Sequence, residues 1–401
     1  MHDSVVIALR DTLDKVTGFI YPNELELQWS ILIVLYPYLT GLVAGAFILA
    51  SLERVFNVKV LKPTYRLSLL TALAFLMIAP LPLQVHLGHP ERSFNILFTP
   101  NPTSAMAMFG FVYLWYLMAV LLMEIWLDYR KEIVGWADTD PSWLKRLIYK
   151  VMTLGVFKPT EKSFVIDDRV GRALTIIGLP SAVLLHGYVG FIFGSIKANP
   201  WWSTPLMPII FLFSAMASGI AGVMLLYMFL CWARDVEIEM PCLDTVAKYF
   251  LTAVIVAFSL EMLESIQTAY EAEEHFDIIQ LLIEGKLYIS LIVIQICLGS
   301  LLPILLLGLT QIFELPEKVR KVFYAVSGTL SLIGIFAMRW NVVVGGQFFS
   351  KSLMGFTTYK LELAGREGLF SASVIAVLPF FVLAGLLWLL PPWENKPGGA
   401  A

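Results

Sequence analysis

The stretch FAMRWNVVVGGQFF, residues 336–349, places an arginine and an asparagine close to the end of a long apolar run. On insertion scales, a charge at the centre of a membrane helix costs roughly 2.5–3.5 kcal/mol. Two explanations for Arg339 follow. Either its side chain extends to the membrane surface, or a polar site inside the protein requires the charge.

Apolar runs of similar length recur along the whole chain. Its 401 residues are 58% hydrophobic and only 15% charged, with a mean hydropathy of +0.76. Soluble domains average roughly 45–50% apolar and about 25% charged residues, and about twenty apolar residues cross a bilayer as a helix. The composition therefore predicts an all-α, polytopic membrane protein with about nine transmembrane helices, within a range of about eight to ten. The expected spans are about 28–53, 67–87, 104–128, 170–197, 203–233, 246–270, 282–311, 322–346 and 369–391.

The positive charges predict how these spans are oriented. If the N-terminus lies outside, lysine and arginine collect in the cytoplasmic segments, above all in a loop at about 129–169. We expect an outer N-terminal segment (1–27), an integral membrane domain (28–393) and a cytoplasmic tail (394–401), in the cell (inner) membrane. The first 26 residues have no continuous apolar core, so no signal peptide is expected.

Few residues could hold a metal or a cluster. Cys231, Cys242 and Cys297 lie far apart and no CxxC occurs, whereas iron–sulfur and zinc sites want several thiolates. Only His86 and His186 lie in or beside apolar runs, so a haem held by two histidines would need both. We expect no metal, haem or iron–sulfur cluster in this chain, and no nucleic-acid partner.

Several spans bring polar groups to one outer level of the membrane. Arg339 and Asn341 fall in the outer third of the eighth span, and Glu261 and Glu264 share one face of the sixth. Carboxylates well inside a span are rarely without function, so a buried polar cluster is the preferred interpretation. Its candidate residues are His186, Tyr188, Glu264, Arg339, Asn341, Glu261 and His86.

Each of these residues also has a purely structural explanation. Arg339 could snorkel to the surface, His186 could be a hydrogen-bonded packing residue, and the HPER stretch after His86 could cap a loop. In the cluster interpretation, Arg339 instead forms an ion pair with Glu264 or Glu261. Breaking such a buried pair typically costs about 3–5 kcal/mol.

The cluster would suit a quinone. A quinone has two carbonyl oxygens that need hydrogen-bond donors, and its redox chemistry moves two protons, which histidine can exchange near neutral pH. Aromatic walls would hold the ring, and Trp201, Trp202 and Trp340 lie at a suitable depth. Two alternatives remain open: a proton-coupled secondary transporter, since buried charges also suit transport, and a haem-bearing cytochrome b-type subunit.

Three acidic residues near the inner ends of the spans could feed a proton path. Glu124 and Asp128 lie near the inner end of the third span, and Glu53 lies at the inner end of the first. A solvated helix end is the more ordinary explanation for all three.

Three stretches together resemble the NrfD/PsrC family of polysulfide-reductase-type membrane subunits: MRWNVVVGGQFFSKSLMGFTTYKLELAGREGLF (338–370), LGHPERSF (87–94) and PSAVLLHGYVGFIFGSIKANPWW (180–202). The resemblance covers essentially all nine spans. The Arg-Trp-Asn and Gly-Gly-Gln elements are most similar to the DsrP-type members of sulfite-reductase-associated (DsrMKJOP) complexes. The spacing from Pro180 to the histidine matches the family pattern and puts His186 at the position of the family's quinone-side histidine.

The resemblance implies a helical-bundle fold with a quinone site near the outer face. It also implies a separate ferredoxin-like iron–sulfur subunit docked there, with further cytochrome or catalytic subunits. The implied function is electron exchange between menaquinone or menaquinol and that partner, with possible proton translocation and no complete enzyme in this chain alone. One departure concerns His86, because several relatives have an aspartate at that position.

Overall fold

The computed structural model describes residues 17–24, 27–99, 101–104, 115–157, 159–272 and 275–393. The described chain is almost entirely helical, which confirms the predicted all-α class. Eight of its helical segments are long and apolar enough to cross a membrane. They start at Ile31, Lys59, Glu161, Met207, Met240, Tyr288, Glu317 and Leu369. Residues 105–114 of the expected span 104–128 lie outside the described ranges, and its described part from residue 115 to 128 is helical.

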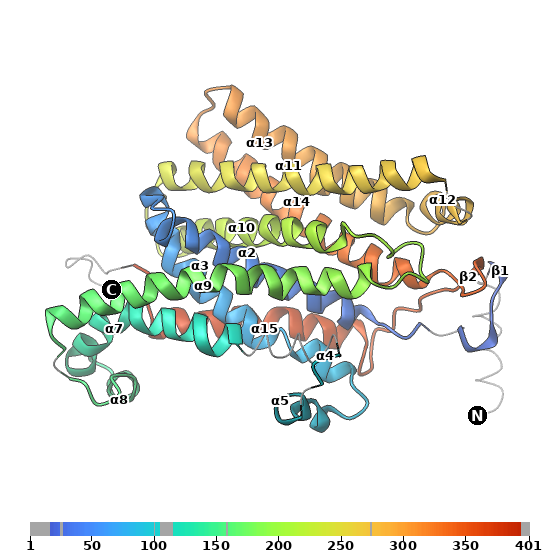
Figure 1. Ribbon diagram of the computed structural model, residues 1–401. Coiled ribbons are helices and arrows are strands. Elements are labelled where there is room, and N and C mark those ends of the chain that lie inside the picture. The colour runs from blue at the N-terminus through green and yellow to red at the C-terminus, as the bar shows by residue number, and fades with distance from the viewer. Residues whose placement is uncertain are drawn as a thin grey trace.

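Figure 1 shows long helices running side by side between two ends of the bundle. The longer elements are α2 (Ile31–Arg54), α3 (Lys62–Ile78), α7 (Leu122–Thr139), α9 (Glu161–Gly194), α10 (Met207–Ala233), α11 (Met240–Glu271), η5 (Tyr288–Leu301), α13 (Leu302–Ile312), α14 (Glu317–Val343) and α15 (Leu369–Leu389). The shorter helices are η1 (Pro22–Glu24), η2 (Lys59–Leu61), α4 (Leu81–His86), η3 (Pro90–Phe94), α5 (Asn95–Phe98), η4 (Tyr116–Leu121), α8 (Trp143–Met152), α12 (Phe276–Glu284) and η6 (Gly345–Gln347). Of these, η4 runs directly into α7.

Helix α2 lies at the centre of the bundle and is buried along almost its whole length. It packs against α3, α9, α10 and α14. Its contact with α10 is very close, because a Cβ atom on Gly219 would run into the backbone of Gly45 and Ala46. Glycine is needed here for the close approach of two backbones, as is common between membrane helices.

A second group of helices packs beside this core. Figure 1 shows α11, α13 and α14 as a layer next to α10 and α2. Within this layer, η5 and α14 cross where Gly299 and Gly334 face each other. Much of η5 and α13 is exposed, as expected for helices that face lipid rather than protein.

The two ends of the bundle differ in structure. At one end, strand β1 (Thr17–Phe19) pairs antiparallel with β2 (Met354–Phe356), so the N-terminal segment is joined to the loop after α14. We name this the β1–β2 end; α12 also lies there, whereas α5 lies below the middle of the bundle (Figure 1). The opposite end carries α8 and the last described residues, and we name it the α8 end.

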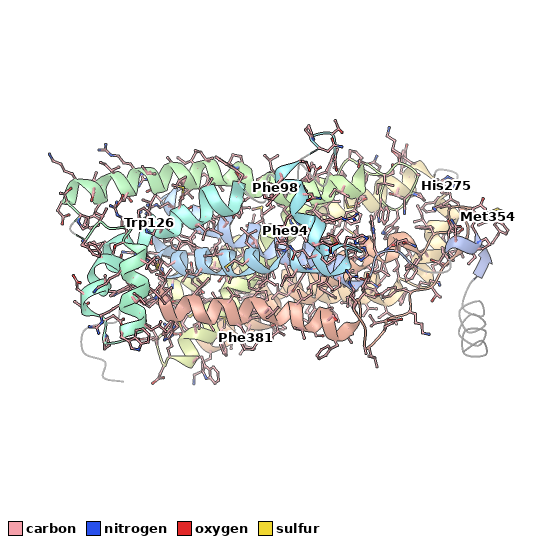
Figure 2. All side chains as sticks on the ribbon, turned by 90° about the horizontal axis from the view of Figure 1, so that it is seen from below. Phe94, Phe98, Trp126, His275, Met354 and Phe381 are labelled. Carbon is pink, nitrogen blue, oxygen red and sulfur yellow. The ribbon has the colours of Figure 1, made fainter. Side chains whose placement is uncertain are left out.

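One segment differs from the sequence-based expectation. The loop expected at about 129–169 is mostly helical, because α7 continues to Thr139, α8 follows, and α9 already begins at Glu161 rather than near residue 170. The early start of α9 has a local cause: the Thr160 hydroxyl caps the helix by accepting from the Ser163 amide. Figure 2 shows the bundle from below, with Phe381 on α15 and Trp126 on α7.

Candidate functional site

Arg339 is the largest fully buried side chain among the described residues. It is 0% exposed. Its Nη2 donates to Ser214 Oγ at 2.7 Å and to the Phe211 carbonyl at 3.3 Å, and lies 3.0 Å from His186 Nε2. The guanidinium carbon lies 3.9 Å from the centre of the Phe211 ring, a cation–π contact. Burial rules out the snorkelling explanation, since the charge is held inside the protein.

The imidazole of His186 is held in one tautomer by this arrangement. A guanidinium group can only donate hydrogen bonds, so His186 Nε2 must accept and the ring proton must sit on Nδ1. The ring is also fully buried, stacks on Phe211 at 5.9 Å, and would lie 3.2 Å from a Cβ on Gly41. Nδ1 has no hydrogen-bond partner within the described part of the chain. The sequence predicted one depth for Arg339 and His186, and the structure brings them into contact.

The expected ion pair between Arg339 and a carboxylate of α11 is not formed among the described residues. Glu261 instead accepts from Gln295 Nε2 at 2.9 Å, and Gln295 Oε1 accepts from Asn341 Nδ2 at 2.8 Å. The carboxylate therefore faces η5 and joins a polar chain that links α11, η5 and α14. Gln295 was not predicted from the sequence, although a glutamine inside a strongly apolar run was a visible signal.

A cavity of about 780 Å³ opens beside this core, between α2, α4, η3, α5 and α9. Its walls are mainly apolar and include Trp29, Ile33, Val189 and Phe193. A few polar groups also line it, among them Tyr36, Gln84, His86 and Arg92. Figure 2 shows Phe94 and Phe98 of the η3–α5 segment close to each other. A mostly apolar cavity of this size with a few polar groups is typical of small-molecule sites.

His86 is fixed at the edge of this cavity by the loop before α15. Its Nδ1 lies 3.0 Å from Glu367 Oε2. The neighbouring Arg366 donates to the carbonyls of Val85 and Leu87 on either side of the histidine. The carboxylate of Glu367 thus orients the ring, as in other carboxylate–histidine pairs. Arg366 and Glu367 were not singled out from the sequence, although they lie inside the stretch 338–370.

The cavity and the Arg339–His186 pair lie about one helical turn apart. On α9, His186 precedes the cavity residue Val189 by three positions. An aromatic contact connects them: the rings of Phe193 and Phe211 are 5.8 Å apart. The positive charge of Arg339 therefore lies deeper in the bundle than the cavity, behind Phe211.

The remaining candidate residues have other surroundings. Tyr188 is partly exposed and stacks on Phe191. Glu264 is partly exposed on α11, and neither it nor Asn341 is among the residues that line the cavity. The expected aromatic walls are present in part. Trp29 lines the cavity and stacks on Trp202, while the indoles of Trp201 and Trp202 donate to the carbonyls of Asn341 and Val342.

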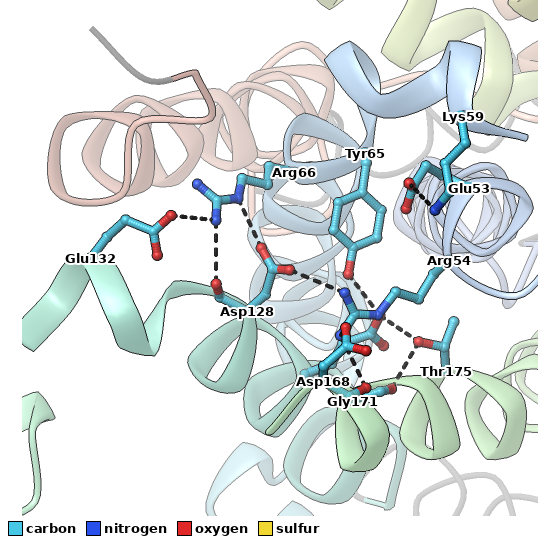
Figure 3. Close-up of polar contacts among 11 residues, drawn as sticks. Glu53, Arg54, Lys59, Tyr65, Arg66, Asp128, Glu132, Asp168, Gly171 and Thr175 are labelled. Carbon is cyan, nitrogen blue, oxygen red and sulfur yellow. Dashed lines mark hydrogen bonds and ion pairs between the residues drawn. The ribbon is translucent and has the colours of Figure 1, made fainter. Parts of the chain in front are cut away.

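A second polar network lies at the α8 end, between α2, α3, α7 and α9 (Figure 3). Asp128 forms ion pairs with Arg54 at 3.5 Å and with Arg66 at 2.8 Å. Arg66 also pairs with Glu132 at 2.8 Å, and Arg54 with Asp168 at 3.2 Å. These charges are mostly buried and mutually neutralised, which is how a membrane bundle tolerates them.

Glu124 lies next to this network and is 0% exposed. Its Oε1 accepts from Thr175 at 2.7 Å and from Tyr65 at 3.4 Å, while Oε2 has no partner among the described groups. Glu53, only 7% exposed, pairs with Lys59. Solvated helix ends are therefore the wrong explanation for these acidic residues, because the protein encloses them.

The described residues contain no group of three or more histidine, cysteine or acidic side chains able to hold a metal ion. One ring nitrogen of each membrane histidine is already engaged, His186 with Arg339 and His86 with Glu367.

The comparisons with known proteins agree with one another. The family model "Polysulphide reductase, NrfD" matches residues 22–351. The chain is 31% identical to a selenate reductase subunit of Mesobacillus selenatarsenatis over 79% of this chain and 73% of that protein. It is 28% identical to protein NrfD of Escherichia coli over 49% of this chain and 58% of that protein. It is 23% identical to an Hdr-like menaquinol oxidoreductase integral membrane subunit of Archaeoglobus fulgidus, over 90% and 81% of the two chains.

Proposed function

The chain belongs to the polysulphide reductase NrfD family of multi-pass membrane proteins, and from that premise we propose that it is the quinone-reactive subunit of a respiratory electron-transfer complex. In this proposal, it exchanges electrons between menaquinone or menaquinol and an iron–sulfur partner. The observation that carries it is the cavity of about 780 Å³ between α2, α4 and α9. The name of the Archaeoglobus relative supports the choice of menaquinone.

The cavity has the composition that a quinone needs. Apolar and aromatic side chains such as Ile33, Val189 and Phe193 would hold the ring and the start of the tail. Tyr36, Gln84 and His86 place polar groups in the same wall, suited to the two oxygens of the head group.

His86 and Glu367 supply a route for a proton. When menaquinol is oxidised, two electrons and two protons leave it. The free ring nitrogen of His86 can accept a proton from one quinol hydroxyl, and the Glu367 carboxylate at the other nitrogen stabilises the resulting imidazolium. In the reverse direction the same pair delivers a proton to the quinone. The resemblance implies an aspartate at this position in several relatives, and a carboxylate could also accept a proton there.

Arg339 and His186 act from behind the cavity in this proposal. The charge of Arg339 lies about one turn deeper and would favour a quinol that carries negative charge. Tyr188, Glu261, Glu264 and Asn341 stay weaker candidates for the quinone site, because none of them lines the cavity. The similarity of residues 338–347 to DsrP-type members is the reason for preferring that branch of the family.

The iron–sulfur partner docks at the β1–β2 end in this proposal, and that end faces outward. A second recess of about 430 Å³ there carries polar groups from distant parts of the chain, including Glu24, Gln28, Asn199 and Lys351. Glu24 joins the N-terminal segment to the loop after α14 by accepting from Ser350 and from the Lys351 amide. A polar, shaped surface close to the cavity suits a partner that takes up electrons.

We also infer that Glu124 belongs to a proton path opening at the α8 end. Its second carboxylate oxygen is buried without a partner among the described groups, and Asp128 lies one helical turn away with Arg54 and Arg66. A carboxylate with one unused oxygen can take up and release a proton without rearranging its contacts to Thr175 and Tyr65.

Photoaffinity labelling tests the quinone proposal. The purified native complex is irradiated with an azido derivative of a menaquinone analogue, and the labelled peptides are identified by mass spectrometry. We expect labelling on α2, α4 or α9 next to the cavity, blocked by excess unlabelled menaquinone. Labelling confined to other helices would contradict the site. A purified protein without partner subunits that moves a labelled solute would instead support a transporter.

A further inference from the structure

Helix α8 (Trp143–Met152) lies across the spanning helices rather than along them. It is seen end-on in Figure 1 and side-on in Figure 2, so both views place its axis crosswise to the bundle. If the long helices cross the bilayer, α8 lies in the plane of the membrane. It is thus placed as an interfacial helix would be.

One side of α8 is fastened to the bundle. The Tyr149 hydroxyl donates to the Leu389 carbonyl at 2.6 Å, which satisfies a free carbonyl at the end of α15. Lys145 Nζ lies 4.5 Å from the centre of the Trp388 ring. The Trp126 indole donates to the Met152 carbonyl at 2.8 Å. These contacts set the height of α8 relative to α15 and α7.

The depth of α8 follows from the length of α15. This helix has 21 residues, Leu369–Leu389. At about 1.5 Å per residue it is about 32 Å long, close to the roughly 30 Å of the hydrocarbon core. The end of α15 therefore marks the boundary between hydrocarbon and head groups, and α8 is attached at that boundary.

The opposite side of α8 is apolar and exposed. Trp143, Leu147 and Val151 recur every four residues and are 70%, 53% and 68% exposed. Leu154 in the turn that follows extends the same row. A contiguous exposed apolar row of this kind is unusual where water is the neighbour.

Basic residues lie beside this apolar row. Arg146 and Lys150 are exposed and one turn apart, and Lys145 is partly exposed. No acidic residue occurs from Trp143 to Phe157; the flanking ones in sequence are Asp140 before this stretch and Glu161 after it. Apolar and positive rows side by side are complementary to a bilayer surface with anionic phosphate groups.

We propose that α8 is an interfacial lipid-binding helix. Trp143, Leu147 and Val151 enter the edge of the hydrocarbon layer, and Arg146 and Lys150 bind the phosphates of anionic phospholipids. The occupant of this face is the bilayer that surrounds the protein, not a further subunit. This assignment is independent of the quinone proposal.

Spin labelling of the full chain in its native complex tests the placement. In a Cys297→Ser background, which leaves only the buried Cys231 and Cys242, nitroxides are attached at Leu147→Cys, Val151→Cys and Lys150→Cys in lipid nanodiscs. Phe381→Cys on the exposed face of α15 and Asp138→Cys serve as lipid and water references. We expect the nitroxides at positions 147 and 151 to be accessible to oxygen, as at the lipid reference 381. The nitroxide at position 150 should be accessible to a water-soluble nickel chelate, as at the water reference 138. Equal nickel access at 147 and 151 would overturn the proposal, as would protection from both reagents, which indicates a protein partner.

Lipid binding tests the basic row. Native mass spectrometry compares retention of phosphatidylglycerol with that of phosphatidylcholine for the complex released from mixed nanodiscs. The double variant Arg146→Gln, Lys150→Gln should lower phosphatidylglycerol affinity about tenfold to thirtyfold, since each basic group near an anionic surface contributes modestly. The control double variant Lys197→Gln, Lys360→Gln removes two exposed charges at the β1–β2 end and should leave the phosphatidylglycerol affinity unchanged. Equal losses in both pairs, or none in the first, would refute the assignment.

Discussion

Arg339 donates to His186 across the interface between α14 and α9, with Nη2 and Nε2 3.0 Å apart. The contact fixes the neutral His186 tautomer and gives a buried cation a partner that is not an anion. Ser214 and the Phe211 carbonyl complete its shell. The charge is held by dipoles and by the Phe211 ring, so its stability depends on several small contacts rather than on one ion pair.

Double-mutant cycles should distinguish this arrangement from an ion pair. Arg339→Leu leaves His186 and Ser214 without their donor, and each unsatisfied buried group costs about 1–3 kcal/mol. Combined with His186→Leu, it should show a coupling of roughly 0.5–3 kcal/mol in the free energy of unfolding. Combined with Glu264→Gln, the effects should add to within about 0.5 kcal/mol. Thermal unfolding in detergent measures the stability of each variant. Strong coupling between Arg339 and Glu264 would contradict the arrangement described here and support an ion pair with the carboxylate.

Substitution of His86 should impair quinol turnover while the complex still assembles. His86→Ala removes the proposed proton acceptor in the cavity wall, and we expect a rate loss of about ten- to a hundredfold. His86→Asp should retain more activity than His86→Ala, because a carboxylate can also accept the proton. Glu367→Gln should give an intermediate loss, since it leaves the imidazolium without its counter-charge.

Menaquinol oxidation by the purified complex, assayed with an artificial electron acceptor, gives these rates. His275→Ala is the control. His275 lies at the β1–β2 end near Met354 (Figure 2) and does not line the cavity, so this variant should behave like the unchanged protein. Unchanged turnover in His86→Ala at both low and saturating quinol would remove His86 from the site.

The spans could be predicted because each is an apolar run of membrane length, and hydropathy alone reveals such runs. The depth of Arg339 and His186 could also be predicted, since topology and residue count fix how far a side chain lies along its helix. Their contact could not be predicted. It depends on how α9, α10 and α14 rotate and pack, and Ser214 and Phe211 look ordinary in an apolar sequence.

The segment between the third and fourth spans was misread for a related reason. Its charges suggested a loop, yet most of it is helical, and the uncharged Thr160 caps the start of α9. Arg54 and Arg66 were read only as orientation signals, although they neutralise Asp128 inside the bundle. Charge pairing between helices far apart in sequence leaves no local pattern.

The crossing of α2 and α10 should tolerate no side chain at its closest point. Gly219→Ala would push a methyl group into the backbone of Gly45 and Ala46, so the helices must separate and lose packing along their length. Overpacking of this kind costs about 1–3 kcal/mol or more. Gly385→Ala on α15 meets nothing within 4 Å and should be neutral. Thermal unfolding of the two variants compares them directly, and equal stability would contradict the close approach.

The attachment of α8 should weaken at alkaline pH. Burial raises the pKa of Tyr149 to about 12, with a smaller contribution from Asp140. A raised pKa means that the neutral phenol stabilises the fold below the ordinary pKa of about 10, and that this stabilisation is lost as the pH rises towards 12. The phenolate cannot donate to Leu389. The mobility of a nitroxide at position 147 should therefore begin to increase above about pH 10. In the Tyr149→Phe variant, which lacks the hydroxyl, this mobility should be high at every pH and should show no increase near pH 10.

Glu124 should matter for proton movement more than for stability. Glu124→Gln keeps an oxygen that can accept from Thr175 and Tyr65, so the bundle should assemble, but the amide cannot carry a proton. In liposomes that contain the complex and a pH-sensitive dye, we expect electron transfer to continue while proton uptake at the α8 end falls by about tenfold or more, as for loss of a positioned proton carrier. Glu132→Gln is the matched control: this residue belongs to the same network through Arg66 but is partly exposed, and it should leave proton uptake intact. If both variants take up protons normally, the buried carboxylate is structural and the path lies elsewhere.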